Sequence, residues 1–413
     1  MVPSWARGKK ILLGISGGIA AYKTAALTRA FVKSGCEVEI IMTDAGAKFV
    51  SPLALSTLTK RRVWRDADFL SDEYGFMIPH ISLTQWADVM VIAPCTGNAL
   101  RIAATGDAST LLGAALLACG RPKVFFPAMN ERMLDNPAAQ ENIKIIRSRG
   151  GIVIDPGVGF LACADEGKGR LLSADEILDE TWRAISPIRD LSGKKILITA
   201  GATHEYLDPV RFISNPSSGK MGYALAEEAL RRGASVSLVS GPSEERVPSG
   251  AKLIGVRSAL EMLDACLAEL NGADAIIKAA AVGDYRAKEI ASRKIKREFA
   301  DSLTIELVRN PDIAREISLR KSNAQILAGF AAETDDVEAN AVRKITAKGL
   351  DMIVANDVSK GDAGFAADTN RVRIYFDEKY ARPPSQVIFG TKQDVAASVI
   401  DELTELVNSK TPD

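Results

Sequence analysis

The chain has 413 residues, too many for one ordinary domain, and its 52 lysine and arginine residues balance its 52 aspartate and glutamate residues. No global field therefore favours nucleic acid or an anionic membrane as a partner, and an anionic ligand must be held by local groups. The five cysteines form no CxxC pair, which argues against a disulfide framework or a zinc site and favours a reducing compartment. His80 and His204 are the only histidines, too few for a multi-histidine metal site.

The first apolar stretch, Lys10–Ile15, follows a basic start and superficially resembles a signal peptide. We interpret it instead as a buried strand that runs into a glycine turn, because Tyr22 and Lys23 interrupt the apolar stretch. No apolar run reaches the ~18 residues that a membrane span needs. We therefore expect a cytoplasmic protein.

Short β-branched runs alternate with helical patterns along the whole chain. In the first half these runs are Lys10–Ile15, Val38–Thr43, Val89–Ala93, Val124–Phe126 and Ile152–Ile154. The pattern restarts after a linker at Pro187–Asp190, and the later runs are Ile196–Thr199, Val236–Val239, Ala275–Lys278, Ile326–Phe330 and Met352–Ala355. Continuous apolar strands separated by helices indicate βαβ units and a parallel sheet covered on both faces. We predict an α/β protein of two doubly wound, mainly parallel-sheet, Rossmann-like domains, 1–190 and 191–413.

A glycine turn containing Ser16, Gly17 and Gly18 ends the first strand and opens a helix. Such a turn allows close approach of a ligand, and the helix N-terminus favours a phosphate. The turn lacks the GxGxxG order of a dinucleotide fingerprint, and the second strand ends in Thr43 rather than in an acidic residue. This pattern favours a mononucleotide phosphate or a ribityl chain, with a merely tight βα turn as the alternative.

Four further segments carry polar side chains in positions that suit a ligand site. They are PHISL with His80, APCTGN with Thr96, PAMNERM with Asn130 and the polar loop ACADEGKGR with Cys163. APCTGN and PAMNERM each close a predicted strand, and parallel sheets bind ligands at the carboxyl edge. A lone histidine such as His80 is usually structural, so the argument depends on the combination.

Together with SGGIAAYK, these motifs resemble the phosphopantothenoylcysteine decarboxylase half of the bifunctional coenzyme A enzymes. That family consists of homo-oligomeric flavin-containing cysteine decarboxylases with a flavodoxin-like fold. The resemblance implies that FMN is bound by Ser16, Gly17, Gly18, Thr43 and Thr96. The substrate thiol is oxidised, the thioaldehyde loses CO2, and the enethiolate is reduced again.

The same resemblance assigns three catalytic residues. His80 acts near the flavin and the substrate carboxylate, Asn130 binds that carboxylate, and Cys163 supplies the proton of the final reduction. The chain departs from the family pattern at Leu134, at Ala164 and at Ser109 with Thr110. These departures bear on the geometry of the loop around Cys163, and we expect an active enzyme with an altered rate.

The second half contains the segment DPVRFISNPSSGKMG, which leads from a strand into a helix. Two of its serines, Ser217 and Ser218, form an anion nest at the helix start together with its two glycines and its lysine. It is not a Walker A loop, because Ser214 replaces the required glycine and Met221 the Ser/Thr. Lys344 and Lys348 share a helix face and could meet one polyphosphate. We interpret Lys278, at a strand end, as edge-exposed rather than catalytic.

This half resembles phosphopantothenate-cysteine ligase over about residues 191–400. The resemblance implies that CTP activates the 4'-phosphopantothenate carboxylate, that pyrophosphate leaves, and that the cysteine amine attacks the acyl-cytidylate. Asn215 and Arg211 would process the acyl-cytidylate, and Lys294 would also stabilise charge during acyl transfer. CTP would be held by Asp284, Lys294, Asn310, Pro311, Asp312, Ile313, Phe330, Lys344 and Lys348. Mg2+ would neutralise the CTP phosphates, with no metal ligand assigned, and His204 is interpreted as tolerated variation.

We therefore predict a bifunctional enzyme that ligates cysteine to 4'-phosphopantothenate and then decarboxylates the product to 4'-phosphopantetheine. The resemblance implies trimers through the flavin domain and dimers through the ligase domain, closing into a dodecamer. Two alternatives remain: a nicotinamide-dependent reductase that uses either glycine turn, and a regulatory binding module without catalysis.

Overall fold

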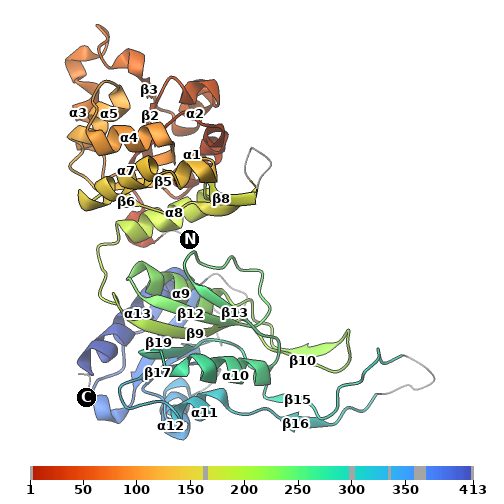
Figure 1. The fold of residues 1–413 in the computed structure, drawn as a ribbon. Coiled ribbons are helices and arrows are strands. Elements are labelled where there is room, and N and C mark those ends of the chain that lie inside the picture. The colour runs from red at the N-terminus through yellow and green to blue at the C-terminus, as the bar shows by residue number, and fades with distance from the viewer. Residues whose placement is uncertain (1–2, 161–165, 297–302, 334–335, 358–368, 411–413) are drawn as a thin grey trace. The chain divides into compact units, whose positions relative to one another are not determined.

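The first unit of the fold spans residues 1–186 and the second spans 187–413. The computed structural model (Figure 1) describes residues 3–160, 166–296, 303–333, 336–357 and 369–410. Each unit is built around one large sheet with helices on both faces. This architecture confirms the predicted α/β class.

The sheet of the first unit has six parallel strands in the order β3-β2-β1-β4-β5-β6. The strands are β1 (Lys10–Ile15), β2 (Glu37–Met42), β3 (Val63–Arg65), β4 (Val89–Cys95), β5 (Lys123–Pro127) and β6 (Ile152–Val153). Without the three-residue edge strand β3 this is the flavodoxin-type order. The chain leaves β1 in one direction and returns at β4 to build the other half. The switch point between β1 and β4 is where such sheets bind ligands.

Alternating side chains of the strands separate two apolar layers. Leu13 of β1 packs with Phe31 and Trp182 on one face, whereas Leu12 packs with Leu100 and Leu112 on the other. The first face is covered by α1 (Thr24–Lys33), α2 (Pro52–Thr59) and α8 (Ala174–Ala184), and the second by α3 (Pro79–Trp86), α4 (Gly97–Thr105), α5 (Leu111–Ala118), α6 (Glu131–Leu134) and α7 (Pro137–Ser148). A separate antiparallel hairpin joins β7 (Gly157–Phe160) to β8 (Glu166–Arg170).

The sheet of the second unit has the order β13-β12-β9-β14-β17-β18-β19-β20. The first six strands are parallel and the last two antiparallel. The strands are β9 (Lys195–Ala200), β12 (Ser235–Ser240), β13 (Lys252–Gly255), β14 (Ala275–Lys278), β17 (Ile326–Glu333), β18 (Met352–Asp357), β19 (Thr369–Phe376) and β20 (Ile388–Thr391). Its switch point lies between β9 and β14.

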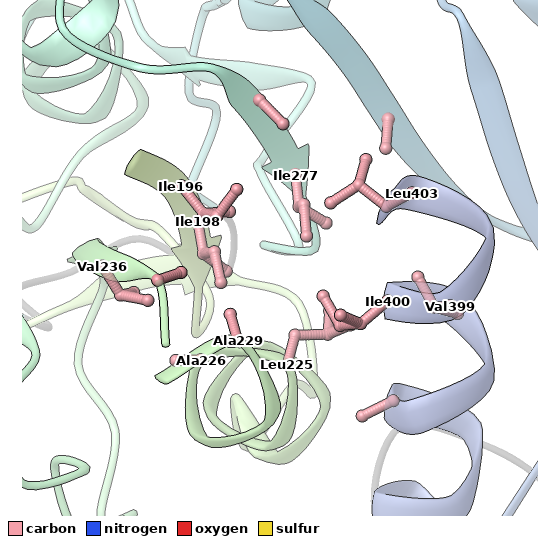
Figure 2. Close-up of a cluster of buried hydrophobic side chains, with 14 of the residues drawn as sticks. Ile196, Ile198, Leu225, Ala226, Ala229, Val236, Ile277, Val399, Ile400 and Leu403 are labelled. Atoms are coloured by element: carbon pink, nitrogen blue, oxygen red, sulfur yellow. The ribbon is translucent and has the colours of Figure 1, made fainter. Parts of the chain in front are cut away.

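Helices α9 (Lys220–Arg231) and α13 (Lys392–Ser409) cover one face of this sheet, and α10 (Ala259–Leu270), α11 (Ile313–Ser318) and α12 (Val337–Lys348) cover the other (Figure 1). Figure 2 shows Leu225 of α9 and Ile400 of α13 directed at Ile198 and Ile277 of the sheet. Two short hairpins project from the sheet: β10 (His204–Tyr206) with β11 (Phe212–Ser214), and β15 (Tyr285–Ala287) with β16 (Leu307–Arg309).

Short 3-10 helices complete the fold: η1 (Ser4–Ala6), η2 (Ile19–Lys23), η3 (Gly46–Lys48), η4 (Asp66–Asp68), η5 (Gly75–Met77) and η6 (Glu378–Tyr380). Within the described part of the chain, no helix combines the length and the apolar character that crossing a membrane requires.

Candidate active sites

The first unit contains a cavity of about 680 Å³ at its switch point. Of the predicted flavin-site residues, Gly17, Gly18 and Thr96 line it, together with the predicted catalytic residue Asn130. These residues follow β1, β4 and β5, so the carboxyl ends of three strands supply one wall.

The glycine turn is shaped by close contacts with its neighbours. A Cβ atom on Gly17 would lie 2.2 Å from the Cβ of Ala45, which excludes any side chain there. A Cβ atom on Gly18 would lie 3.2 Å from Cγ2 of Thr96, within the cavity wall. The bare backbone of the turn therefore faces a space with room for a flavin nucleotide, and the residues present fit that group.

Ser16 and Thr43 are not among the residues that line this cavity. The hydroxyl of Ser16 donates to the carbonyl of Pro94 at 2.7 Å and accepts from the backbone N–H of Thr96 at 3.0 Å. The hydroxyl of Thr43 accepts from the backbone N–H of Gly46 at 3.1 Å. Both side chains hold the loops around the cavity in the structure described.

His80 lies at the start of α3 and does not line the cavity that holds Asn130. Its ring packs edge-on against Phe69, with 5.3 Å between the ring centroids. Its Nδ1 atom is buried and has no hydrogen-bond partner among the described residues. A single copy of the chain thus does not bring His80 and Asn130 together in one cavity.

Cys163 and Ala164 lie outside the described residues, but the hairpin that carries them is anchored beside Asn130. The backbone N–H of Met129 donates to the carbonyl of Gly169 at 3.1 Å, and the N–H of Lys168 donates to the Glu131 carboxylate at 3.1 Å. A Cβ atom on Gly169 would lie 2.0 Å from the carbonyl oxygen of Met129. Only glycine allows this approach, which fixes the base of the hairpin over the cavity.

Two cations that the sequence analysis left without a role also line the cavity: Lys23 and Arg170. Burial lowers the pKa of Lys23, and the charge of Arg170 lowers it further, while Glu176 opposes the shift. Both residues lie inside the quoted motifs, so a search for cations beside the glycine turn could have found them.

The second unit contains a cavity of about 220 Å³ at the carboxyl ends of β14 and β17. Eight of the nine predicted CTP-binding residues line it: Asp284, Asn310, Pro311, Asp312, Ile313, Phe330, Lys344 and Lys348. The convergence joins segments from four parts of the sequence. The prediction that Lys344 and Lys348 share a helix face is confirmed, because both lie on α12 and face this cavity.

Asp312 links two walls of this cavity. Its carboxylate accepts from the backbone N–H groups of Ala314 and Arg315, at the start of α11, and pairs with Lys348 at 3.0 Å. Burial is the largest single influence and opposes its ionisation, but Lys348, the backbone N–H of Arg315 and the charge of Lys278 together lower the pKa of Asp312. The nearby amide of Asn310 donates to the carbonyl of Gly283 at 2.8 Å.

Lys278 lines the same cavity, so its interpretation as edge-exposed was wrong. Its strand, β14, lies between β9 and β17 in the middle of the sheet. Burial is the main cause that lowers the pKa of Lys278 to about 8, helped by Lys348 and opposed by Cys266 and Asp312. Sequence alone does not reveal which strands are central in a sheet, and the central position of β14 is the reason that Lys278 is not at an edge.

Lys294 does not line this cavity. Its segment is held by Asp208, a fully buried residue that accepts from the backbone N–H groups of Val210 at 2.7 Å, Arg211 at 2.8 Å and Ile295 at 3.0 Å. The side chain of Arg211 lies 3.6 Å from the same carboxylate. Asp208 therefore places Arg211 and Lys294 in one neighbourhood, a role that the sequence analysis did not assign.

Asn215 connects this neighbourhood to the segment that follows β14, the strand that carries Lys278. Its side-chain amide donates to the carbonyl of Val282 at 3.2 Å. The predicted anion nest leads into α9 through Gly219, whose φ of +86° suits glycine. A Cβ atom on Gly222 would lie 2.6 Å from the Cβ of Ala200, so the helix packs closely on the end of β9.

His204 stacks on Phe212 with 3.8 Å between ring centroids, and burial lowers its pKa. The described residues contain no group of three histidine, cysteine, aspartate or glutamate side chains that could hold a metal ion.

Two family models match the chain. The model described as "Flavoprotein" covers residues 2–186, and the model described as "DNA/pantothenate metabolism flavoprotein C-terminal domain" covers residues 191–407.

Full-length relatives match both units together. The coenzyme A biosynthesis bifunctional protein CoaBC of Bacillus subtilis is 42% identical over 401 residues, covering 96% of this chain and 97% of the relative. The protein of the same name from Escherichia coli is 43% identical over 374 residues, covering 90% and 91%. A solved C-terminal domain of such a protein is 39% identical and covers 54% of this chain and 100% of its own, with a TM-score of 0.45. The sequence matches confirm the resemblance inferred from the motifs.

Proposed function

The chain belongs to the family of bifunctional coenzyme A biosynthesis proteins, and on that premise we propose how its two units divide the work. The second unit, 187–413, ligates cysteine to 4'-phosphopantothenate through an acyl-cytidylate formed from CTP. The first unit, 1–186, decarboxylates the resulting phosphopantothenoylcysteine with FMN. The product of both steps is 4'-phosphopantetheine.

In the first unit, the turn at Gly17 and Gly18 and the loop at Thr96 hold the flavin. Bound FMN supplies the oxidation of the substrate thiol and the later return of the electrons. Asn130 binds the substrate carboxylate with its side-chain amide, so that the bond to CO2 is oriented for cleavage. Cys163 lies, in sequence, between the two strands of the hairpin that Gly169 anchors, and it supplies the proton of the final reduction.

In the second unit, CTP occupies the cavity between α11 and α12. Lys344 and Lys348 neutralise nucleotide charge, and Asp312 fixes the position of Lys348. Mg2+ enters with the nucleotide, because magnesium is commonly bound by substrate phosphates and only one or two carboxylates. Arg211 and Asn215 bind the acyl-cytidylate, and Lys294 stabilises the charge that develops on the reacting carbonyl.

The active enzyme is a homo-oligomer in the cytoplasm, and we propose a dodecamer built from trimers of the first unit and dimers of the second. Two observations support assembly through the first unit. His80 does not share a cavity with Asn130 within one chain. Close to His80 in sequence, Leu70 and Phe76 are 87% and 81% exposed, an apolar surface suited to a second copy.

One observation carries this proposal: two separate cavities, one at the switch point of the first sheet and one beside β14 and β17 of the second, gather residues from distant motifs, four in the first unit and eight in the second. The test incubates the purified protein with CTP, cysteine and 4'-phosphopantothenate and measures pyrophosphate and CO2 separately. We expect both, and no turnover of NADH or NADPH. Release of neither product would contradict the proposal, and CO2 from added phosphopantothenoylcysteine without pyrophosphate from CTP would restrict it to the first unit.

The Cys163→Ser variant separates the steps of the first reaction. We expect it to retain FMN and release CO2 but to accumulate the unsaturated thiol. Full conversion to 4'-phosphopantetheine by this variant would remove Cys163 from the proposed role.

A further inference from the structure

Arg170 enters the flavin cavity from the end of β8, and its side chain lies along the neighbouring strand β7. A Cβ atom on Gly157 would lie 3.5 Å from Nη2 of Arg170, and one on Gly159 would lie 3.4 Å from its Cδ. The guanidinium therefore occupies space that two glycines leave open on β7. This packing restricts the Arg170 side chain to a defined position.

The guanidinium has unused hydrogen-bonding capacity on this side. Its Nε atom is buried, and no residue in the described ranges accepts a hydrogen bond from it. A buried donor without a partner costs free energy, so a small shift of the Arg170 side chain that brings Nε to a bound acceptor would be stabilising.

Lys23 brings a second positive charge to the same wall of the cavity, at the end of η2. The like charge of Arg170 acts on Lys23 strongly enough to lower the pKa of the ammonium, after the larger effect of burial. The charge of Glu176 opposes this shift, and one of its carboxylate oxygens accepts from the backbone N–H of Ser173 at 2.7 Å as part of a capping box. Despite Glu176, the pKa of Lys23 is lowered, so an external anion near both cations would be stabilised by them.

The glycine turn needs such support to bind a phosphate. The helix after the turn opens with the 3-10 segment η2, and its N-cap residue Gly18 provides no side-chain cap. The backbone N–H of Ala21 already donates to the carbonyl of Gly18 at 2.9 Å. Charged side chains further along the chain, such as Lys23, can supply hydrogen-bond donors to a phosphate that the glycine turn does not supply.

We propose that Lys23 and Arg170 form a subsite for a phosphate monoester in the flavin cavity. The inference rests on the proposed function, because that function supplies two such groups: the phosphate of FMN and the 4'-phosphate of phosphopantothenoylcysteine. An arginine fork and an ammonium group together match the oxygens of a dianionic phosphate.

The test compares ligands with and without the phosphate, using the full-length protein and the variants Lys23→Gln and Arg170→Gln. FMN and riboflavin are titrated into flavin-stripped protein by fluorescence quenching. Phosphopantothenoylcysteine and pantothenoylcysteine are compared by their KM for CO2 release in the flavin-loaded protein. Arg170→Lys keeps the charge but removes the fork, and Lys168→Gln, an exposed change in the same strand, is the matched control.

If the pair binds the flavin phosphate, each Gln variant weakens FMN by about tenfold to a hundredfold and leaves riboflavin unchanged. If it binds the substrate phosphate, FMN affinity is retained, and the KM of the phosphorylated substrate alone rises by a similar factor. A variant that weakens the phosphorylated and dephosphorylated ligands equally, or neither, overturns the subsite. Wild-type protein that binds no flavin and releases no CO2 would overturn the proposed function and the subsite together.

Discussion

The hydroxyl of Ser16, at the end of β1, accepts a hydrogen bond from the backbone N–H of Thr96, at the end of β4, with 3.0 Å between the two atoms. The same hydroxyl donates to Pro94, so one buried side chain joins the two strands that flank the switch point. The Thr96 N–H depends on this hydroxyl, whereas the Pro94 carbonyl also accepts from the backbone N–H of Ser16 at 3.4 Å.

We predict that Ser16→Ala destabilises the first unit by about 1 to 3 kcal/mol, because it leaves the backbone N–H of Thr96 without its acceptor, whereas the Pro94 carbonyl still accepts from the backbone N–H of residue 16. The variant should also lose flavin more readily, since Thr96 lines the cavity. Urea unfolding followed by flavin release measures both effects. Ser56→Ala, an exposed change on α2, is the control and should shift neither quantity. Equal behaviour of the two variants would contradict the bridging role.

Lys278 leads to a prediction about pH. Its ammonium is charged below the folded-state pKa of about 8 and neutral above it, whereas an ordinary lysine stays charged to 10.5. If the ammonium faces bound CTP, the affinity for CTP should fall as the pH rises from 7 to 9. The charged and titratable groups around it are Asp284, Asp312, Lys344, Lys348 and the buried thiol of Cys266. We expect Lys278→Met to weaken CTP about tenfold at pH 7 and to flatten this pH profile.

Calorimetric titration at several pH values measures this effect. Lys252→Met, which removes an exposed lysine from the edge strand β13, is the matched control and should keep the wild-type profile. A steep profile in Lys278→Met would assign the titration to another group.

Asp351 anchors the far side of the second unit. Its buried carboxylate accepts from the hydroxyl of Tyr380 at 2.7 Å and pairs with Lys379 at 2.7 Å and Lys321 at 3.0 Å. Burial alone would raise its pKa, but the bonds from Lys379, Tyr380 and the backbone of Leu327 lower it to about 2. The folded-state pKa is below the ordinary 3.8, so this carboxylate contributes stability above pH 3.8 that is lost as the pH falls towards 2.

We therefore predict that Asp351→Asn loses about 2 kcal/mol of unfolding free energy near neutral pH, and that its stability depends less on pH between 4 and 2. Thermal unfolding of the full chain over this range gives both numbers. Glu306→Gln, which removes an exposed partner of Lys288, should change stability by less than about 0.5 kcal/mol. If Asp351→Asn lost as much stability as the wild type between pH 4 and 2, Asp351 would not be the group responsible for this pH dependence.

Asp208 is predicted to act by position, through the segments of Arg211 and Lys294. Asp208→Asn weakens three backbone hydrogen bonds, so we expect the ligation rate to fall at least tenfold while CO2 release from added phosphopantothenoylcysteine is unchanged. Lys294→Gln should slow ligation without lowering the unfolding temperature, in contrast to Asp208→Asn. Asp264→Asn, on the exposed side of α10, serves as the control. An Asp208→Asn variant with normal ligation would exclude this positioning role.

The buried parallel strands could be predicted because each is an unbroken apolar run, and all ten predicted runs are strands. The sequence analysis did not identify the short or partly exposed strands, such as β3 and the two projecting hairpins, because three residues carry no period. In the strand Thr369–Phe376, Arg371 and Arg373 alternate with Val372 and Ile374, a period-two pattern in the sequence that is typical of a half-buried strand.

The site was predictable as a set of motifs, but not in its geometry. Eight of the nine residues predicted to bind CTP line one cavity, and Lys278 joins them only because β14 is central. Ser16 adjoins the glycine turn in sequence, but its hydroxyl is used by Pro94 and Thr96. The direction of a side chain depends on packing from distant segments, and a single sequence does not report it.

The hydrogen bond from Ile295 to Asp208 spans 87 positions of the chain. At a synthesis rate of about 5 to 20 residues per second, Ile295 is therefore added roughly 4 to 17 seconds after Asp208, and only then can the last of these hydrogen bonds form. The whole first unit has been synthesised by then. It can therefore fold on the ribosome before the second unit is able to form the hydrogen bonds around Asp208.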